Sequence, residues 1–301
     1  MEALENLPPI ARLSDRVVRV LGQNPGKFTL QGTNTYIVGS RNPYTLIDTG
    51  EGKEEYIPFL ASALKEHAPP SDPQQPDISD IIISHRHGDH IGGLPSVLAL
   101  LRQSLPPGSF EPNRGGSALH DLVDGQTLEI GSSTSLRVLH TPGHTVDSIC
   151  LHFPEDNAVF TADTVLGQGT AVFEDLSTYI SSLQSLAAYK DKEPGKRDYA
   201  LLYPGHGPVV KEGLKTISTY IQHRLERESQ IVQVLQSPAP DNAEVWTPWT
   251  IVSKIYAAYP ESLWLPASHG VILHLRKLEK DGKVRFLGGE GKDGRWQLST
   301  S

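Results

Sequence analysis

Short apolar runs, each followed by glycine or polar residues, recur along the first two thirds of the chain. Runs of this kind that are rich in Val, Ile, Leu, Phe and Tyr predict strands. We therefore expect strands at 17–21, 35–38, 44–47, 81–83, 127–130, 135–140, 148–153, 158–161 and 199–203. Apolar residues three and four positions apart predict helices at 54–67, 94–101 and 175–189. Many strands with interspersed helices predict two packed sheets covered by helices.

The pattern changes from Leu214 onward, where helical spacing dominates. A long amphipathic helix is expected at 211–235, followed by a linker at 237–243 that is rich in proline and small residues. Thr247 directly precedes Pro248, so we expect Thr247 to be the N-cap of a second helix that begins at Pro248. A third helix is expected at 269–280, and a hairpin pairs 283–287 with 295–298. This order is typical of a winged-helix module, so we predict a catalytic domain at 1–212 and a helical linker with a winged-helix-like domain at 213–301.

Composition and charge narrow the class of protein. The 301 residues are 38% hydrophobic and 21% charged, as in ordinary globular proteins, and the formal net charge is −8. A chain with a net negative charge is not expected to bind nucleic acid along its whole surface. No apolar run is long enough to span a bilayer. The first five residues hold two acids and no basic segment, so we expect neither a signal peptide nor a membrane partner, and a cytoplasmic location.

The chemistry is concentrated in the segment Ser84-His-Arg-His-Gly-Asp-His90, directly after the predicted strand at 81–83. Histidines two residues apart at the end of a strand can turn toward one cation, and the Asp and His just past the turn can reach a second. Four potential ligands at this spacing are improbable in an ordinary surface loop. The single cysteine, Cys150, lies in a predicted strand and is expected to be a small core residue rather than a nucleophile.

Further ligand-type residues occur where other predicted strands end in turns. His144 follows Pro-Gly, Asp163 follows Thr-Ala, and His206 lies between two glycines. A strand end is where a rigid scaffold brings a side chain to a shared edge, and flanking glycines allow the backbone to approach closely. Taken alone, each of these residues is as consistent with a turn or a helix cap as with a metal ligand. Together with the HxHxDH segment they predict a site for two metals.

These motifs resemble those of the metallo-β-lactamase superfamily, in which HxHxDH is followed by His, Asp and His. The resemblance covers about residues 15–210 and implies an α+β fold, the four-layer αββα sandwich. It implies that one metal is held by His85, His87 and His144 and a second by Asp89, His90 and His206, with Asp163 bridging. Two Zn²⁺ are expected, with Mn²⁺ or Fe as alternatives, because His/Asp sites accept several metals.

The same resemblance implies a mechanism. Metal ions lower the pKa of water, so that hydrolysis needs no protein nucleophile. Asp89 is then both a ligand and the catalytic residue that orients the attacking water. The turn at 48–50 (Asp-Thr-Gly) is expected to support the site from behind the ligands.

Within the superfamily the chain resembles the glyoxalase II-like group, and in it the branch that contains the animal β-lactamase-like protein 2, an endoribonuclease, and the fungal atrochrysone carboxyl-acyl-carrier-protein thioesterases. The resemblance rests on segments 32–38, 166–179, 203–208 and 220–224. Secreted lactam-destroying enzymes fit less well, because they are expected to carry a signal peptide and often a Cys ligand on the second metal, and neither is found here. RNA-processing enzymes with a large inserted domain fit less well, because only 42 residues (164 to 205) separate Asp163 from His206. Glyoxalase II itself has a different, helical C-terminal domain. Phe173, Glu174 and Tyr179 either line the pocket or pack at the entry to a helix.

Three functions remain open at this point. The preferred one is a thioesterase that releases a polyketide acid from an acyl carrier protein domain of a polyketide synthase. The alternative is a single-stranded RNA endoribonuclease, for which residues 266–301, with seven Lys/Arg and four Asp/Glu, offer a weak basic excess. The last is a metal-bearing binding protein without turnover. The net charge of −8 and the scarcity of aromatic residues around the predicted metal loops favour the carrier-bound ester over RNA.

Overall fold

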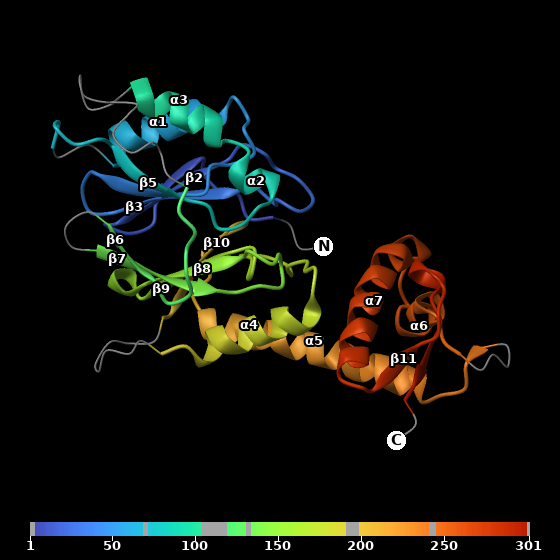
Figure 1. Cartoon of the computed structure of the whole chain (residues 1–301). Coiled ribbons are helices and arrows are strands. Elements are labelled where there is room, and N and C mark those ends of the chain that lie inside the picture. The colour runs from blue at the N-terminus through green and yellow to red at the C-terminus, as the bar shows by residue number, and fades with distance from the viewer. Residues whose placement is uncertain are drawn as a thin grey trace.

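Two five-stranded sheets form the centre of the N-terminal part of the chain (Figure 1). The computed structural model describes residues 4–68, 72–103, 119–130, 134–190, 199–240 and 245–299. The first sheet has the order β1 (Ile10–Arg12), β2 (Val17–Leu21), β3 (Asn34–Val38), β4 (Tyr44–Ile47) and β5 (Ile78–Ile82). The second has the order β10 (Leu201–Pro204), β9 (Ala158–Ala162), β8 (Ile149–Phe153), β7 (Thr134–His140) and β6 (Thr127–Ile130).

All neighbouring strands are antiparallel except one pair in each sheet. The parallel pairs are β4 with β5 and β9 with β10. The carboxyl ends of two parallel strands lie at the same edge of a sheet, so each pair delivers the residues that follow it to one place. This arrangement decides where the ligand-type residues meet.

Apolar side chains fill three layers and produce the predicted αββα sandwich, which is confirmed. The central layer lies between the sheets and contains Tyr36, Leu136, Phe153 and Phe160. The outer face of the first sheet is covered by α1 (Tyr56–Glu66) and α3 (Leu94–Gln103), and that of the second by α4 (Leu176–Ala188) and α5 (Gly213–Leu235). A short helix, α2 (Gly88–Ile91), and a 3-10 turn, η1 (Pro154–Asp156), complete this part.

The C-terminal module has the predicted winged-helix outline. It consists of α6 (Pro248–Ile255), η3 (Glu261–Leu263), α7 (Trp264–Lys280), β11 (Val284–Phe286), η4 (Gly291–Asp293) and β12 (Trp296–Leu298). Thr247 caps α6 through a reciprocal pair of hydrogen bonds with Thr250, as expected for a residue followed by Pro. Among the described residues, no helix is both long and apolar enough to cross a membrane.

Several element boundaries differ from those expected. The strand before the histidine cluster is Ile78–Ile82 rather than 81–83, and a short helix rather than a turn follows it. Helix α7 begins at Trp264, five residues before the predicted start, because Pro266 fits the first turn of a helix. Residues 241–243 of the predicted linker lie outside the described residues.

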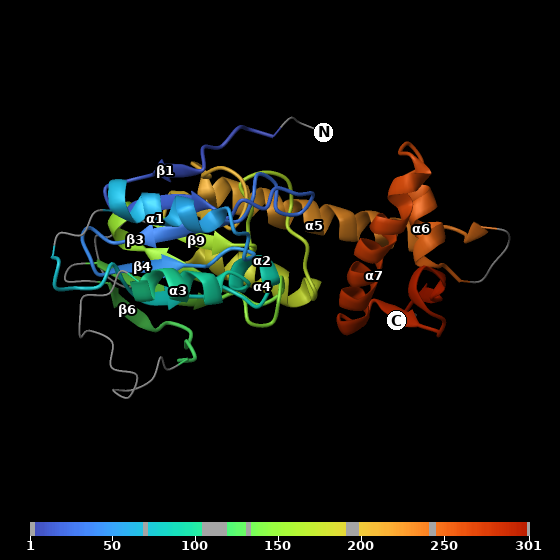
Figure 2. The ribbon, with the colours of Figure 1, turned by 90° about the horizontal axis from the view of Figure 1, so that it is seen from above.

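Helix α5 belongs to two apolar cores. Near its start, Ile217 and Tyr220 pack in the core that covers the second sheet. Near its end, Ile231 and Leu235 pack in the core of the C-terminal module. Figures 1 and 2 both show α5 leaving the sandwich and carrying the module beyond the end at which α2 lies. The domain boundary predicted at residue 212 directly precedes this helix.

Candidate metal centre

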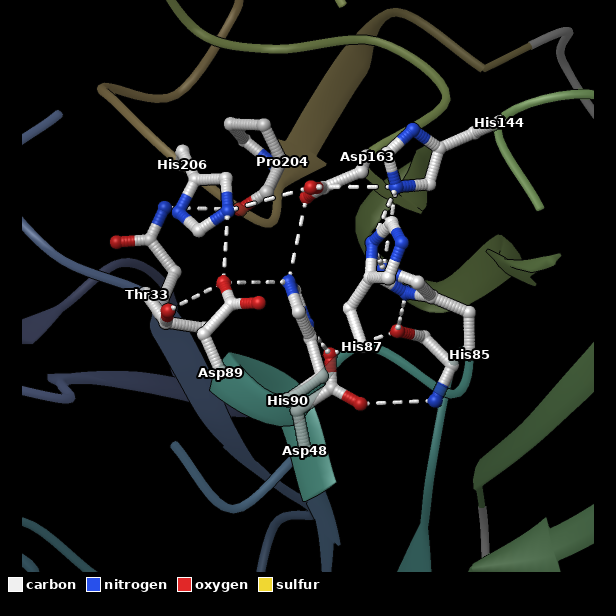
Figure 3. Close-up of polar contacts among 12 residues, drawn as sticks. Thr33, Asp48, His85, His87, Asp89, His90, His144, Asp163, Pro204 and His206 are labelled. Atoms are coloured by element: carbon white, nitrogen blue, oxygen red, sulfur yellow. Dashed lines mark hydrogen bonds and ion pairs between the residues drawn. The ribbon is translucent and has the colours of Figure 1, made fainter. Parts of the chain in front are cut away.

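Seven polar side chains from four connections meet at one edge of the sandwich (Figure 3). His85 and His87 follow β5, and Asp89 and His90 lie in α2. The remaining three follow β7, β9 and β10 and are His144, Asp163 and His206. The structure therefore brings together all seven residues that the sequence singled out, in two groups: His85, His87, His144 and Asp163, and Asp89, His90 and His206.

Three imidazole nitrogens converge in the first group. His144 Nε2 lies 3.2 Å from His85 Nε2 and 2.9 Å from His87 Nδ1, and the last two nitrogens are 3.1 Å apart. Three ligands of a tetrahedral Zn²⁺ lie about 3.3 Å from one another when each bond is about 2.0 Å. The spacing of these nitrogens is therefore close to that of a single coordinated cation.

The hydrogen bonds behind these rings determine which nitrogen carries a proton. Val172 O can only accept, so it takes a hydrogen bond from His144 Nδ1 at 2.8 Å. Ser84 Oγ donates to Asp48 at 2.8 Å and therefore accepts from His85 Nδ1 at 3.0 Å. The Nε2 atoms of His85 and His144 thus face each other as lone pairs, an arrangement that a cation between them would stabilise.

The second group repeats this design. His90 Nδ1 donates to Asp48 Oδ2 at 2.7 Å, and His206 Nδ1 lies 3.4 Å from Gly32 O. The Nε2 atoms then point inward, at 3.3 Å and 3.2 Å from Asp89 Oδ2. These side chains supply two nitrogens and one carboxylate oxygen, a donor set that suits Zn²⁺ and related divalent ions.

Asp163 joins the two groups. One of its oxygens lies 3.5 Å from His144 Nε2 and 3.3 Å from His206 Nε2, and the other lies 3.4 Å from His90 Nε2. His90 Nε2 and Asp163 Oδ1 are buried, yet neither forms a hydrogen bond within the part of the chain that the structure describes. Buried polar atoms of this kind require a partner, and a cation between them would provide one. The residues present therefore fit a pair of divalent metal ions.

The electrostatics of the site agree with this fit. Burial, together with the charge on His90, lowers the pKa of His85 to about 3, so His85 is a neutral imidazole at pH 7. Burial also lowers the pKa of His206, but the carboxylates of Asp163 and Asp89 outweigh it and raise this pKa to about 9. The second group thus attracts positive charge, which a metal ion would supply in place of protons.

Asp48, predicted to support the site, holds both groups in place. Its Oδ1 accepts from Ser84 N at 2.8 Å, while its Oδ2 accepts from Ser84 Oγ and from His90 Nδ1. Its backbone φ is +60°, a left-handed conformation that Asp tolerates better than most residues. One carboxylate therefore orients a ring from each group.

Close approach of the backbone explains the glycine before His206. A Cβ on Gly205 would lie 2.4 Å from Asp163 Oδ1 and 2.9 Å from His90 Cε1. Only glycine lets the end of β10 pass beside these side chains. The backbone of Thr33 pairs with that of His206 in an isolated β-bridge, and the hydroxyl group of Thr33 donates a hydrogen bond to Asp89 Oδ2 at 3.0 Å. No local signal in the sequence indicates this role of Thr33.

The segment after Asp163 contains the three residues expected either to line the pocket or to pack. Tyr179 packs: it is fully buried and donates to Thr164 O at 2.7 Å. Glu174 accepts two hydrogen bonds from Arg86, at 2.6 and 2.8 Å, which tie this segment to the loop of His85 and His87. Phe173 lines a cavity between α5 and α7.

Cys150 is a core residue, as expected. It is fully buried in β8, and burial raises the pKa of its thiol to about 11. A thiol in this state is not a nucleophile at neutral pH.

With this fold and site, the chain belongs to the metallo-β-lactamase superfamily, whose family model matches residues 28–206. A second model, the beta-lactamase associated winged helix domain, matches residues 247–296. The predictions of the superfamily and of the winged-helix module are therefore confirmed.

Similar proteins extend the likeness to most of the chain. A beta-lactamase-like protein 2 homolog of Caenorhabditis elegans is 38% identical over 94% of this chain and 91% of its own. An atrochrysone carboxyl ACP thioesterase of Aspergillus chevalieri is 36% identical over 94% of this chain and 87% of its own. The crystal structure of a beta-lactamase domain protein from Burkholderia ambifaria has a TM-score of 0.70 at 16% identity, over 98% of this chain and 95% of its own. Its likeness concerns the fold.

Proposed function

We propose that this chain is a two-metal hydrolase that cleaves a thioester on an acyl carrier protein and releases a polyketide acid. The observation that carries hydrolysis is the convergence of two ligand groups on the shared carboxylate of Asp163, whose Oδ1 has no hydrogen-bond partner in the described chain. The first ion would be held by His85, His87 and His144, the second by Asp89, His90 and His206. Two divalent cations supply Lewis acidity, which lowers the pKa of water and polarises an acyl oxygen.

The protein's own residues orient the reactants. Asp89 is the more exposed of the two carboxylates, with 21% of its side chain accessible against 11% for Asp163, so it is the one that a water molecule can reach. Its pKa lies well below the ordinary value: burial alone would raise it, but the imidazoles of His206 and His90 lower it. We assign Asp89 the task of accepting a hydrogen bond from the attacking water and passing its proton to the leaving thiol.

Exposed apolar side chains beside the site support an acyl substrate. Val172, whose carbonyl binds His144, has 56% of its surface exposed, and Val146, two residues after His144, has 65%. Ile91, adjacent to His90, is 38% exposed. Single exposed apolar residues are common, but three that each lie within two residues of a ligand in sequence, or accept its hydrogen bond, are suited to contact a hydrocarbon chain. The similarity to a fungal ACP thioesterase points to the same substrate class.

The alternative, an endoribonuclease acting on single-stranded RNA, has weaker support. Four of the seven Lys/Arg residues in 266–301 form ion pairs with acidic side chains: Lys277, Lys280, Lys283 and Lys292. Paired lysines contribute little to attraction of a polyanion. The binding protein without turnover is disfavoured because no member of the ligand set is missing.

One assay separates these functions. Purified full-length protein is mixed with a carrier protein that bears a thioester-linked polyketide and, separately, with single-stranded RNA, each with and without a chelator. We expect release of acid that the chelator abolishes and that Zn²⁺ restores, with the RNA intact. Chelator-sensitive RNA cleavage without acid release would establish the nuclease instead, and bound metal without either reaction would indicate a binding protein.

An Asp89→Asn variant is the matched control, because it keeps the shape of the side chain and removes the proton acceptor. We expect its acid release to fall at least 100-fold, in the range found for a lost general base. An unchanged rate in this variant would trace the activity to a contaminant or to another residue.

A further inference from the structure

A cavity lies between α5, α7 and the segment that follows Asp163. It has a volume of about 470 Å³, and residues of both helices line it together with Thr170 and Phe173 of that segment. A volume of this size suits a small ligand or the end of a larger one. Figures 1 and 2 show α7 standing beyond the end of the sandwich, opposite this segment.

One wall of the cavity carries positive charge. Arg224 and Arg227, on successive turns of α5, face it together with His274 of α7. Neither arginine forms an ion pair with a carboxylate in the described part of the chain; their guanidinium groups lie 4.7 Å from the ring of Phe173 and 4.6 Å from that of Tyr256. The one acidic lining residue, Glu226, is exposed and accepts a hydrogen bond from Gln222.

Two buried nitrogen atoms in this wall have no partner. His274 is 3% exposed, and its Nδ1 forms no hydrogen bond within the described chain. The same holds for Arg224 Nε, although Arg224 Nη2 donates to Ala171 O at 2.9 Å. Burial, with the charges of Arg224 and Arg227, lowers the pKa of His274 to about 3. His274 is therefore neutral, and the positive charge comes from Arg224 and Arg227; the unpaired Nε–H of Arg224 beside a second arginine indicates that an anion belongs there.

The α7 side of the cavity is otherwise apolar and leaves room. Ala267, Gly270 and Val271 lie on the same face of α7 as His274, and a Cβ on Gly270 would meet no atom within 4 Å. Glycine lowers helix stability relative to alanine, so its place in the middle of α7 has no local structural reason. Apolar side chains in the same cavity as two arginines fit a ligand whose anionic group is adjacent to alkyl carbon.

The cavity and the metal centre share one short segment of backbone. Ala171 O accepts from Arg224, and the next carbonyl, Val172 O, accepts from His144. Neighbouring residues are about 3.8 Å apart along the chain. The cavity and the ligand histidine His144 are therefore joined by a single short segment of backbone.

We propose that this cavity binds the phosphate and the adjacent dimethyl carbon of the phosphopantetheine arm that presents the thioester; this rests on the thioesterase function proposed above. The phosphate accepts hydrogen bonds from Arg224 and Arg227, and the two methyl groups lie against Ala267, Gly270 and Val271. The arm then runs past Phe173 toward His144. This arrangement makes the phosphate a determinant of substrate recognition at a distance from the reacting carbonyl.

The test compares two acyl thioesters that differ only in the phosphate: those of 4′-phosphopantetheine and of pantetheine. The wild-type protein is expected to have a kcat/KM at least about tenfold higher for the phosphorylated thioester, the effect of one charge-assisted contact. Calorimetry on the full chain with the two free arms gives a readout that does not depend on turnover, and only the phosphorylated arm is expected to bind.

Two variants locate the effect. Arg224→Gln removes a cation, and Gly270→Leu fills the cavity from a helical position with open space around it. In both we expect the preference for the phosphorylated thioester to fall to about twofold or less, and calorimetric binding to be lost. Arg276→Gln is the matched control: it removes the same charge from exposed α7 surface outside the cavity and should keep the wild-type preference.

Each outcome separates this proposal from the function on which it rests. Hydrolysis of both thioesters at equal rates, with neither arm bound, would overturn the phosphate site and leave the thioesterase standing. Binding of 4′-phosphopantetheine that Gly270→Leu abolishes would support the site even if no thioester were hydrolysed. Binding of single-stranded RNA that Arg224→Gln weakens, with the two arms not distinguished, would assign the cavity to a polynucleotide and overturn the proposal.

Discussion

The hydroxyl group of Thr33 donates a hydrogen bond to Asp89 Oδ2 at 3.0 Å. The direction is fixed, because an ionised carboxylate can only accept, and Thr33 Oγ1 in turn accepts a hydrogen bond from Asn24 Nδ2 at 3.0 Å. Asn24 also accepts from the backbone nitrogen of Thr33 at 2.9 Å, so the two residues hold each other rigidly. A relay from Asn24 through Thr33 therefore keeps the carboxylate of Asp89 facing His90 and His206.

Loss of this hydrogen bond should reduce catalysis without unfolding the protein. Thr33→Val keeps the shape of the side chain and removes its donor to a charged group, a contact worth about 1.5–3 kcal/mol. We expect kcat/KM to fall roughly 10- to 100-fold, the rate change that corresponds to this free energy. Thr33→Ser keeps the hydroxyl group and should stay near the wild-type value. A Thr33→Val variant with wild-type kinetics would show that Asp89 is held by the metal ligands alone.

Removal of a single ligand side chain should abolish turnover. His87 is only half-buried at the start of α2, so His87→Ala leaves little uncompensated polar surface behind it. We expect a loss of at least about 1,000-fold in kcat, a lower metal content by elemental analysis and an unchanged circular dichroism spectrum. His120→Ala, at an exposed histidine outside the cluster, serves as the control. Full turnover by His87→Ala would mean that the ligand set is wrong.

Thiol reagents should not inhibit the native protein. Cys150 is fully buried, and its raised pKa of about 11 keeps it protonated at pH 7. We expect iodoacetamide to leave the activity unchanged over hours and to modify the cysteine only after unfolding in urea, as mass spectrometry would detect. Rapid inactivation together with alkylation of the native protein would contradict the assignment of Cys150 to the core.

Stability at low pH should depend on Asp175. This residue caps α4 by accepting from Thr178 N at 2.9 Å and pairs with Lys280 Nζ of α7 at 2.5 Å. Burial alone would raise the pKa of Asp175, but Lys280 and Thr178 outweigh it and lower this pKa. A carboxyl group with a lowered folded-state pKa stabilises the fold above its unfolded pKa, and that stability is lost as the pH falls through the folded pKa.

We therefore expect Asp175→Ala to lower the free energy of unfolding by about 1 kcal/mol at pH 7, the usual effect of losing an N-cap. Urea denaturation should show that this difference shrinks as the pH falls below about 4. Lys280→Gln removes only the half-exposed ion pair and should cost less than about 1 kcal/mol. A cost of Asp175→Ala that stays constant down to pH 2 would indicate that packing, rather than charge, is responsible.

The sequence predicted the sandwich and the seven converging residues because both depend on local signals. Apolar runs predict the strands, and the ligand-type residues that follow four of these strands predict a shared edge of the sheets. The roles of Asp89 and of the individual ligands remain predictions until metal content and kinetics are measured. Asp48 was also expected, from its place at the end of a strand.

The remaining features depend on contacts between distant parts of the chain. Thr33 is an ordinary residue in sequence, and its role follows only from the bridge that places it beside His206, 173 positions later. The cavity at Arg224 and His274 has no local signal either, since it exists only where α5 meets α7. The expected start of α7 at residue 269 was five residues late: the helix begins at Trp264, with Pro266 in its first turn, where a helix tolerates proline.

The double membership of α5 in two cores has a consequence for how such enzymes can diverge. Its 23 residues form one uninterrupted helix, so the angle at which the module faces the site is set by helical phase. Each residue added to or removed from the middle of α5 would turn the module by about 100° and shift it by about 1.5 Å. Single-residue insertions in this helix would thus reorient the module in large steps, whereas point substitutions on α7 would change its position relative to the site only slightly.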